Sequence, residues 1–472
     1  MSQGGCACRR WIVYVAMGLT LLSAQWMSAQ DTAGQNPDLH ALKDKLQHLE
    51  QEIQELKGEI EAVEQVQSTP LAAAAAALRT PPVPPTENGK ASTEQERSES
   101  AIDMYGFVMT DTGYDFGQIN PQWFDVERPT QLPSYPNQYG GNGNVYFGVR
   151  QTRFGVKTST PTRMGDLKTQ FEFELFGTGV DAGQTTFRLR HAYGELGQFG
   201  AGQTWSPFMD IDVFPNSIEY WGPNGMVFFR NVQLRWMPVR TNRTDLTLAL
   251  ERPGASADQG VYSNRIELEN VKPRFNVPDI TGHLRLTRNW GYVQAAGIFR
   301  KIGWVDFNDP HYNFSGTAYG WGVNVTSNVK LSTRDIARLA VVYGEGIENY
   351  MNDAPVDIGA QNNFSNPVSP VKGVPLPVLG VVSFLDHNWS ERFSSSTGYS
   401  LVNIDNSNAQ NPSDFHQGHY ALANLLYHPV PQVTMGGEFQ FGRRLNFTDG
   451  YSFNDYKMQF SFKYDWKKTL AY

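Results

Sequence analysis

The chain has 472 residues, a formal net charge of −8, 13% aromatic residues and two cysteines. This weakly acidic balance, without a basic cluster, excludes the electrostatic footprint of a nucleic-acid-binding protein. Both cysteines, Cys6 and Cys8, precede the first apolar segment. If that segment is removed on export, the mature chain has no thiol, which excludes disulfides, cysteine nucleophiles and cysteine-based zinc sites.

Residues 1–29 predict a cleavable secretory signal peptide. Arg9 and Arg10 precede an apolar core over 11–22, and small residues follow as far as Ala29. An uncleaved anchor helix is the alternative, but the apolar run is shorter than the ~20 residues that a membrane span needs. No later segment is apolar for long enough to form a membrane helix. An exported chain of this kind is either soluble or crosses a membrane as a closed β-barrel.

Residues 37–67 predict an α-helical coiled coil. Apolar side chains recur there at alternating spacings of three and four residues, at Leu39, Leu42, Leu46, Leu49, Ile53, Leu56, Ile60 and Val63. Most of the charged pairs expected between neighbouring helices attract one another, which favours parallel pairing without fixing the number of helices. A single amphipathic helix packed on its own domain is the alternative.

Residues 68–100 read as a linker, with an alanine tract, closely spaced prolines and then a polar stretch that has nothing to bury. From residue 101 to residue 472 the composition changes: glycine and aromatic residues are abundant, and short segments alternate between apolar and polar residues. Such a period of two indicates strands with one apolar and one polar face. The clearest examples are 170–176, 185–196, 231–237, 319–326 and 456–466.

Periodicity does not separate a soluble β-sandwich from a transmembrane barrel, but three further features favour the barrel. Aromatic residues lie near the ends of the alternating segments, as interfacial girdles do. The polar faces lack the lysine-rich edge protection of a soluble sheet. Short connections such as 332–335, 387–392 and 428–432 alternate with long polar ones such as 351–377 and 403–416. We therefore predict an all-β transmembrane barrel of about 16 antiparallel strands, which encloses an aqueous channel instead of a packed core.

The segment "TTFRLRHAYGEL" (185–196) fixes which face meets lipid. Phe187 and Leu189 lie on one side of the strand, whereas Arg188 and Arg190 lie on the other. A guanidinium group in hydrocarbon costs ~2–4 kcal/mol near the membrane midplane, so the arginines are expected to face the lumen. Rings of arginine select anions, and the planar guanidinium suits a carboxylate. The lumen candidates are Arg153, Arg188, Arg190, Arg230, Arg235 and Arg285.

Each candidate arginine also has a structural alternative. Glu172 and Glu174 lie on the segment before Arg188 and Arg190, so these residues could form salt bridges within the wall. Arg230 is out of phase with Arg235, but it follows "YWGPNG", a segment that must turn. A loop folded into the lumen is the usual way in which a porin narrows its channel.

Three stretches resemble the DcaP-like family of trimeric outer-membrane porins: "GQTWSPFMDIDVFPNSIEYWGPNGMVFFRNVQLRW" (202–236), "YGEGIENYMND" (343–353) and "GGEFQFGRR" (436–444). The heptad segment is similar to the N-terminal periplasmic coiled coil of that family. The resemblance implies a sixteen-stranded barrel in the bacterial outer membrane, assembled as a homotrimer. It also implies that small organic anions such as dicarboxylates pass through an arginine-rich constriction.

The leading hypothesis is therefore a passive, anion-preferring porin that is not an enzyme and needs no cofactor or metal. His416 and His419 have a spacing that metal sites use, but no third ligand lies nearby in the sequence. A barrel enzyme of the lipase or protease type is the alternative from another class, with His387 and the serines at 394–396 as its crude candidates. A structural tether with the coiled coil as its stalk is the third hypothesis. In the periplasm that coiled coil could hold the trimer together, reach peptidoglycan or dock a partner.

Overall fold

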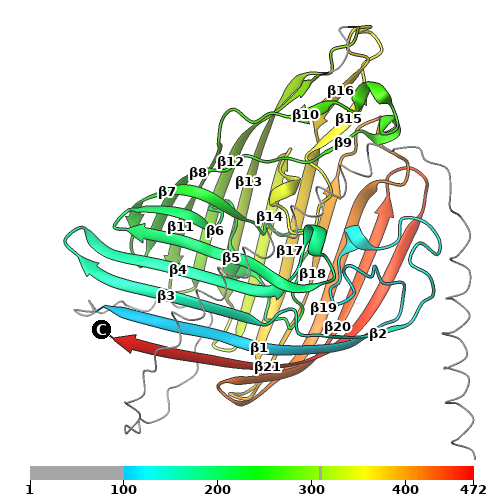
Figure 1. Cartoon of the computed structure of the whole chain (residues 1–472). Coiled ribbons are helices and arrows are strands. Elements are labelled where there is room, and N and C mark those ends of the chain that lie inside the picture. Colours follow the sequence, from blue (N-terminus) through cyan, green and yellow to red (C-terminus); the bar gives the residue numbers. More distant parts are fainter. Residues whose placement is uncertain (1–99, 308–310, 472) are drawn as a thin grey trace, which may run out of the picture. The chain divides into compact units, whose positions relative to one another are not determined.

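The computed structural model describes residues 100–307 and 311–471, which form a closed antiparallel β-barrel with 16 strand positions (Figure 1). The first strand, β1 (Ala101–Asp115), pairs along its whole length with the last, β21 (Ser452–Ala471), and so closes the barrel. The predicted signal peptide and coiled coil, and all of the predicted linker except its last residue, lie outside the described residues. Among the described residues, no segment forms a helix that could span a bilayer.

The other wall strands follow one another in chain order. They are β3 (Arg153–Thr162), β4 (Gly165–Phe176), β5 (Thr185–Leu196), β6 (Phe199–Trp205), β7 (Arg230–Arg240), β8 (Thr244–Glu251), β11 (Asp279–Arg288), β12 (Gly291–Asp306), β13 (Gly316–Lys330), β14 (Asp335–Glu345), β17 (Pro377–Asn388), β18 (Phe393–Ile404), β19 (Phe415–Val430) and β20 (Val433–Asn446). Two short strands extend wall positions: β2 (Asn144–Gly148) pairs with β1 beyond β3, and β10 (Val271–Pro273) pairs with β12 beyond β11.

The remaining elements lie in the long connections. A separate sheet contains β9 (Ala257–Asp258), β15 (Ile358–Asn362) and β16 (Val371–Pro375), which lie together at the top of Figure 1. The described helices are short 3-10 turns: η1 (Pro129–Gln131), η2 (Gly179–Asp181), η3 (Ile211–Val213), η4 (Gly260–Tyr262), η5 (Ile266–Leu268) and η6 (Glu348–Tyr350).

Short and long connections alternate around the barrel, as predicted. The turns after β13, β17 and β19 contain only a few residues, whereas the connections after β14 and β18 are long. Two further connections are also long. The first connection (residues 116–152) joins β1 to β3, and the inner loop (residues 206–229) joins β6 to β7.

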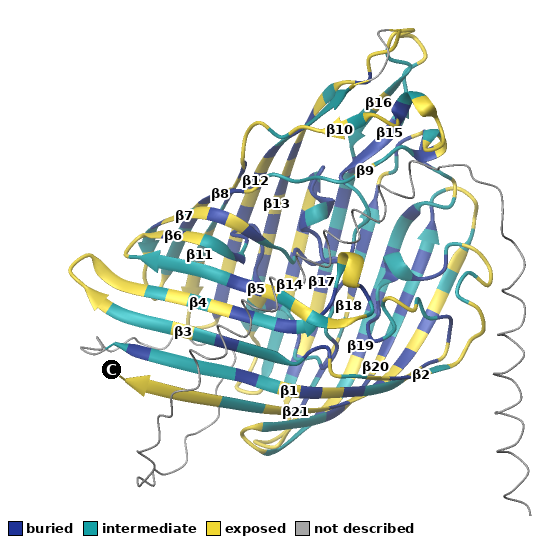
Figure 2. Ribbon diagram, in the orientation of Figure 1, coloured by how far each residue is buried: buried dark blue, intermediate teal, exposed yellow. Residues whose placement is uncertain are grey.

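The predicted division between the two faces of the wall is confirmed. Phe187 is 75% exposed on the outer surface, whereas Arg190 is buried inside. The same alternation runs along β21, where Phe460 and Phe462 are exposed and Gln459 is buried. Figure 2 shows it as bands of exposed and buried residues along the strands. Lipid accounts for the pattern, because apolar side chains that water would disfavour are stable in contact with hydrocarbon.

The prediction of an interior without a packed core is wrong for one side of the barrel. Phe208 and Val227 of the inner loop are fully buried in an apolar cluster with inward-facing wall residues, among them Val342 of β14, Val378 of β17 and Val402 of β18. The wall there is apolar on its inner face as well as its outer face, as in "PVLGVVSF" (377–384). A strand that is buried on both faces reads as a nearly continuous apolar run. This side of the interior therefore anchors the inner loop.

Candidate functional site

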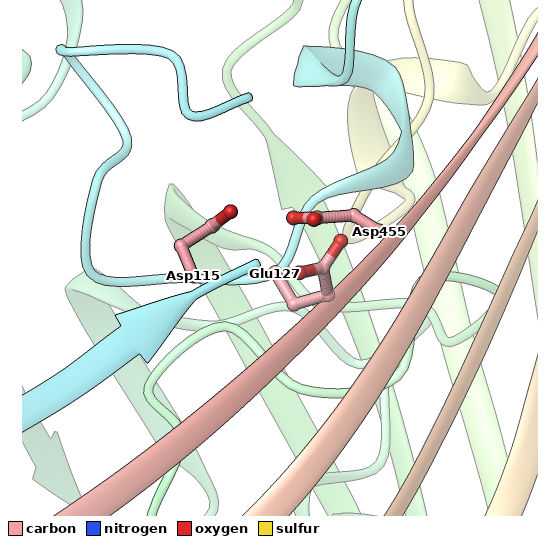
Figure 3. Close-up of side chains that lie close together, drawn as sticks. All are labelled: Asp115, Glu127 and Asp455. Carbon is pink, nitrogen blue, oxygen red and sulfur yellow. The ribbon is translucent and has the colours of Figure 1, made fainter. Parts of the chain in front are cut away.

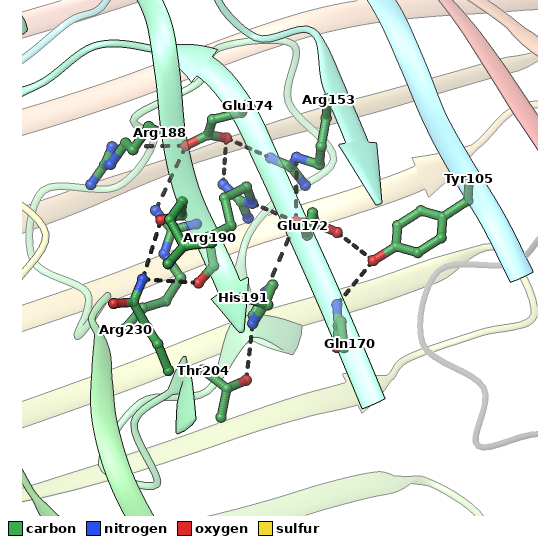
Figure 4. A network of polar contacts seen from close by, with 12 residues as sticks. Tyr105, Arg153, Gln170, Glu172, Glu174, Arg188, Arg190, His191, Thr204 and Arg230 are labelled. Carbon is green, nitrogen blue, oxygen red and sulfur yellow. Dashed lines mark hydrogen bonds and ion pairs between the residues drawn. The ribbon is translucent and has the colours of Figure 1, made fainter. Parts of the chain in front are cut away.

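Two inward-facing glutamates form the centre of the candidate site. Glu172 and Glu174 project from β4 into the barrel, and both are buried. Their carboxylates are surrounded by arginines from β3, β5 and β7 (Figure 4). Tyr105 of β1 and Tyr220 of the inner loop each donate a hydrogen bond to one of these carboxylates. The glutamates thus hold the loop and four strands of the wall together.

Four of the six predicted arginines contact this pair of glutamates. Arg153 lies 3.2 Å from Glu174 and 3.7 Å from Glu172. Arg188 and Arg230 lie 3.8 and 3.7 Å from Glu174. Four guanidinium groups therefore meet two carboxylates, so the cluster has an excess of positive charge. The side chain of Arg188 is the most accessible of the four at 30% exposure, whereas that of Arg230 is 6% exposed.

Arg190 lies at the centre of the cluster, at a β-bulge in β5. The register between β4 and β5 shifts at this point: Glu172 faces His191, the next residue of β4 faces Leu189, and Arg190 is left between them. From this position between the two glutamates, Arg190 reaches both, at 2.6 Å from Glu172 and 2.5 Å from Glu174. The simple alternation predicted for this segment ends there, because Arg190 and His191 are both buried.

A cavity of about 240 Å³ lies beside the exposed edge of the arginine cluster. Arg188 and Arg230 contribute the charged side chains of its lining. Aromatic rings from the inner loop form much of the remaining lining, and Tyr220 among them stacks on Phe176 of the wall with ring centroids 3.9 Å apart. The cavity therefore combines guanidinium groups, which attract anions, with flat apolar surfaces.

The two other predicted arginines do not join this cluster. Arg235 faces inward further along β7, donates hydrogen bonds to Gln233 and the carbonyl of Trp205, and lies over the ring of Tyr193. Arg285 on β11 forms ion pairs with Asp210 and Asp212 of the inner loop. Both arginines lie inside the barrel, but carboxylates outnumber the arginine around Arg285.

Arg128, which lies in the first connection, is not among the predicted arginines. Its guanidinium is sandwiched between the indoles of Trp123 and Trp221, 4.1 and 4.0 Å from the ring centroids. It also lies 2.9 Å from the carboxylate of Asp353 in a third long connection. Burial lowers the pKa of Arg128, and Asp353 acts in the opposite direction. No periodic pattern marks this residue, because it lies outside the strands.

The predicted alternatives to the arginine site lack a supporting arrangement. His416 accepts or donates a hydrogen bond with Asn406, whereas His419 pairs with Tyr399 on the outer surface. His387 pairs with Asp335. The hydroxyl of Ser394 instead lies 3.2 Å from His428, whose other ring nitrogen meets a threonine hydroxyl where a catalytic triad has a carboxylate.

A closed barrel with an apolar exterior and charged residues on part of its inner face is typical of an outer-membrane channel. The DcaP outer membrane protein family model matches residues 26–455. The chain therefore belongs to the DcaP outer membrane protein family, whose porin structural relatives are channels and not enzymes.

One solved structure of a DcaP channel agrees with this fold. The outer membrane channel DcaP of Acinetobacter baumannii superposes with a TM-score of 0.65 at 20% identity, over 79% of this chain and 99% of that one. OmpT of Vibrio cholerae, as a loop-deletion mutant, has a TM-score of 0.48 and 13% identity over 78% and 100% of the two chains. An anion-selective porin from Comamonas acidovorans has a TM-score of 0.48 and 9% identity over 78% and 100%. No curated protein matches the sequence.

Proposed function

We propose that the protein is a homotrimeric porin whose water-filled lumen passes small organic anions, such as dicarboxylates, in preference to cations. The observation that carries this proposal is the excess of arginine over glutamate in the cluster beside the 240 Å³ cavity. A permeating carboxylate would exchange water for guanidinium N–H donors at Arg188, the most accessible arginine there. The neighbouring aromatic rings would contact the apolar part of the permeant.

The other five predicted arginines of the filter differ in their surroundings. Arg153, Arg190 and Arg230 would set the local potential from buried positions. Arg235 and Arg285 would contribute to the field at a distance from the cavity. The homotrimer is supported by the heptad pattern of residues 37–67 and by the family resemblance, and the coiled coil would lie in the periplasm, where it could also reach peptidoglycan or another partner.

Planar-bilayer recording tests the proposal. The full chain should insert as conductance steps in groups of three, and its reversal potential in a salt gradient should favour the anion. Arg188→Glu should shift that potential towards cations, because it changes the local charge by two units beside the cavity. Arg334→Glu, on an exposed short turn, is the matched control and should shift it far less.

Two outcomes would count against the proposal. Equal shifts in the two variants would remove Arg188 from the filter. A wild-type protein that inserts but conducts no ions would favour the structural tether.

A further inference from the structure

Three buried carboxylates meet at the seam where the barrel closes. Asp115 is the last residue of β1, Asp455 lies on β21, and Glu127 reaches them from the first connection (Figure 3). One oxygen of each lies within 4.8 Å of those of the other two. All three residues are 1% exposed. Figure 3 shows their carboxylates turned towards a common space.

Most of these oxygens have no hydrogen-bond partner among the described residues. Glu127 is fully buried and is aimed at the aspartate pair, yet neither of its oxygens accepts a hydrogen bond. The same holds for one oxygen of Asp115 and one of Asp455. Buried polar atoms are nearly always partnered, and an unpartnered carboxylate oxygen is particularly unfavourable. Four such atoms around one space require either shared protons or a positively charged partner.

Two glycines leave space for the carboxylates, because a larger residue at either position would clash with them. A Cβ atom at Gly442 would lie 1.9 Å from an oxygen of Glu127, and one at Gly117 would lie 2.2 Å from an oxygen of Asp455. Beside the cluster is a cavity of about 10 Å³, lined in part by Asp115, Asp455 and Lys457. That volume is close to what one water molecule requires.

Lys457 balances only part of the charge. Its ammonium lies 3.7 Å from Asp115 and 3.9 Å from Glu127, and it donates its close hydrogen bond to the carbonyl of Val126 at 2.7 Å. Three carboxylates against one ammonium leave two negative charges when all are ionised. A divalent cation would neutralise the cluster.

We propose that Asp115, Glu127 and Asp455 bind a divalent cation, and that the cation is Ca²⁺. Carboxylate oxygens are hard ligands, which suit Ca²⁺ and Mg²⁺ better than Zn²⁺. Mg²⁺ dehydrates reluctantly and usually keeps several waters, whereas Ca²⁺ accepts a coordination shell made largely of protein oxygens. The neighbouring cavity has room for about one water, which favours Ca²⁺.

The cation would fasten the first connection to the barrel seam. Glu127 also donates its backbone N–H to Glu219 of the inner loop at 3.0 Å, so the site is linked to the segment that carries Tyr220 and Trp221. Calcium at the seam would thereby stabilise both inward-folded connections. This inference does not depend on which ions pass through the channel.

Calcium binding by the full chain in detergent tests the site. After treatment with EDTA, equilibrium dialysis against radioactive Ca²⁺ should show one tightly bound ion per chain, and Ca²⁺ should raise the thermal unfolding midpoint. Asp455→Asn and Glu127→Gln keep the side-chain shape and should weaken Ca²⁺ binding at least tenfold. Asp181→Asn, on an exposed connection, removes the same charge and should leave binding unchanged, which also controls for calcium held by lipopolysaccharide.

Two results would overturn the calcium site. If the carboxylates are instead neutralised by shared protons, the wild type binds no Ca²⁺ at the seam, and its unfolding midpoint is the same with and without the ion. Equal binding by the wild type, Asp455→Asn, Glu127→Gln and Asp181→Asn would also overturn the proposal. The wild-type measurement decides the matter even if a variant does not fold.

Discussion

The two sides of the barrel interior differ more than the two sides of its exterior. On β4 and β5 the inward residues are charged, with Glu174 and Arg190 at the centre of an ion-pair cluster. On β14, β17 and β18 many inward residues, among them Val342, Val378 and Val402, are apolar and pack against the inner loop. The outer faces of both sides are equally apolar, because both contact lipid. The composition of the outer face is thus determined by lipid alone, whereas the composition of the inner face depends on what each side contacts.

The two sides of the interior therefore have different roles. The apolar side holds the inner loop in place by burial, which is a non-directional and cumulative interaction. The charged side meets the other face of the loop and the 240 Å³ cavity. A change on the apolar side should therefore act on stability and on loop position, and a change at the cavity should act on ion selectivity.

The largest expected effect comes from Phe208→Ala on the apolar side. Phe208 is fully buried, so removal of its ring should cost about 3–5 kcal/mol of unfolding free energy if the cavity does not collapse. The loosened inner loop should also increase the noise of the open-channel current. Phe187→Ala is the matched control, because it removes the same ring from the lipid-facing surface. Denaturant unfolding and bilayer recording measure the two effects, and equal losses of stability would mean that the inner loop is not anchored by this cluster.

A smaller loss of stability is expected from Arg190→Gln on the charged side. The substitution removes two short ion pairs to carboxylates that keep other partners, so the net cost should be close to that of one hydrogen bond to a charged group, about 1.5–3 kcal/mol. Arg153, Arg188 and Arg230 remain near Glu174 and limit the cost of the change. Arg240→Gln, which breaks an exposed pair with Glu195, should cost less than about 1 kcal/mol and is the control. Unfolding in denaturant measures both variants. Equal losses of stability in Arg190→Gln and Arg240→Gln would contradict this interpretation.

The outer face of this protein could be predicted because lipid imposes the same rule on every strand. Phe187, Leu189, Arg188 and Arg190 lie where alternation placed them, since the penalty for the reverse orientation is large. Alternation also predicted that Arg153 faces the interior, where it contacts Glu172 and Glu174. The bulge at Arg190 could not be foreseen, because it depends on pairing with β4 and not on the local pattern.

The interior was harder to predict because its contacts join distant parts of the chain. The ion pair of Arg128 with Asp353 spans 225 residues, and neither residue lies in an alternating segment. The acidic cluster at the seam likewise combines the first and last strands with a connection. One signal was available, since "PVLGVVSF" (377–384) is apolar on both faces and so indicates burial on both. A wall that contacts only water on its inner face would not need that composition.

The smallest expected effect, and the sharpest test of the charged side, comes from Arg188→Lys. The side chain is partly exposed and lies 3.8 Å from Glu174, so stability should change by about 1 kcal/mol or less. The charge is retained, and the reversal potential should stay close to that of the wild type, unlike the shift expected from Arg188→Glu. Lysine, however, is a point charge and cannot present the planar pair of N–H donors that grips a carboxylate. Block of the chloride current by succinate should therefore weaken by up to about tenfold, or about 1.4 kcal/mol. Arg334→Lys should leave the block unchanged, and an unchanged block in Arg188→Lys would mean that Arg188 acts through its charge alone.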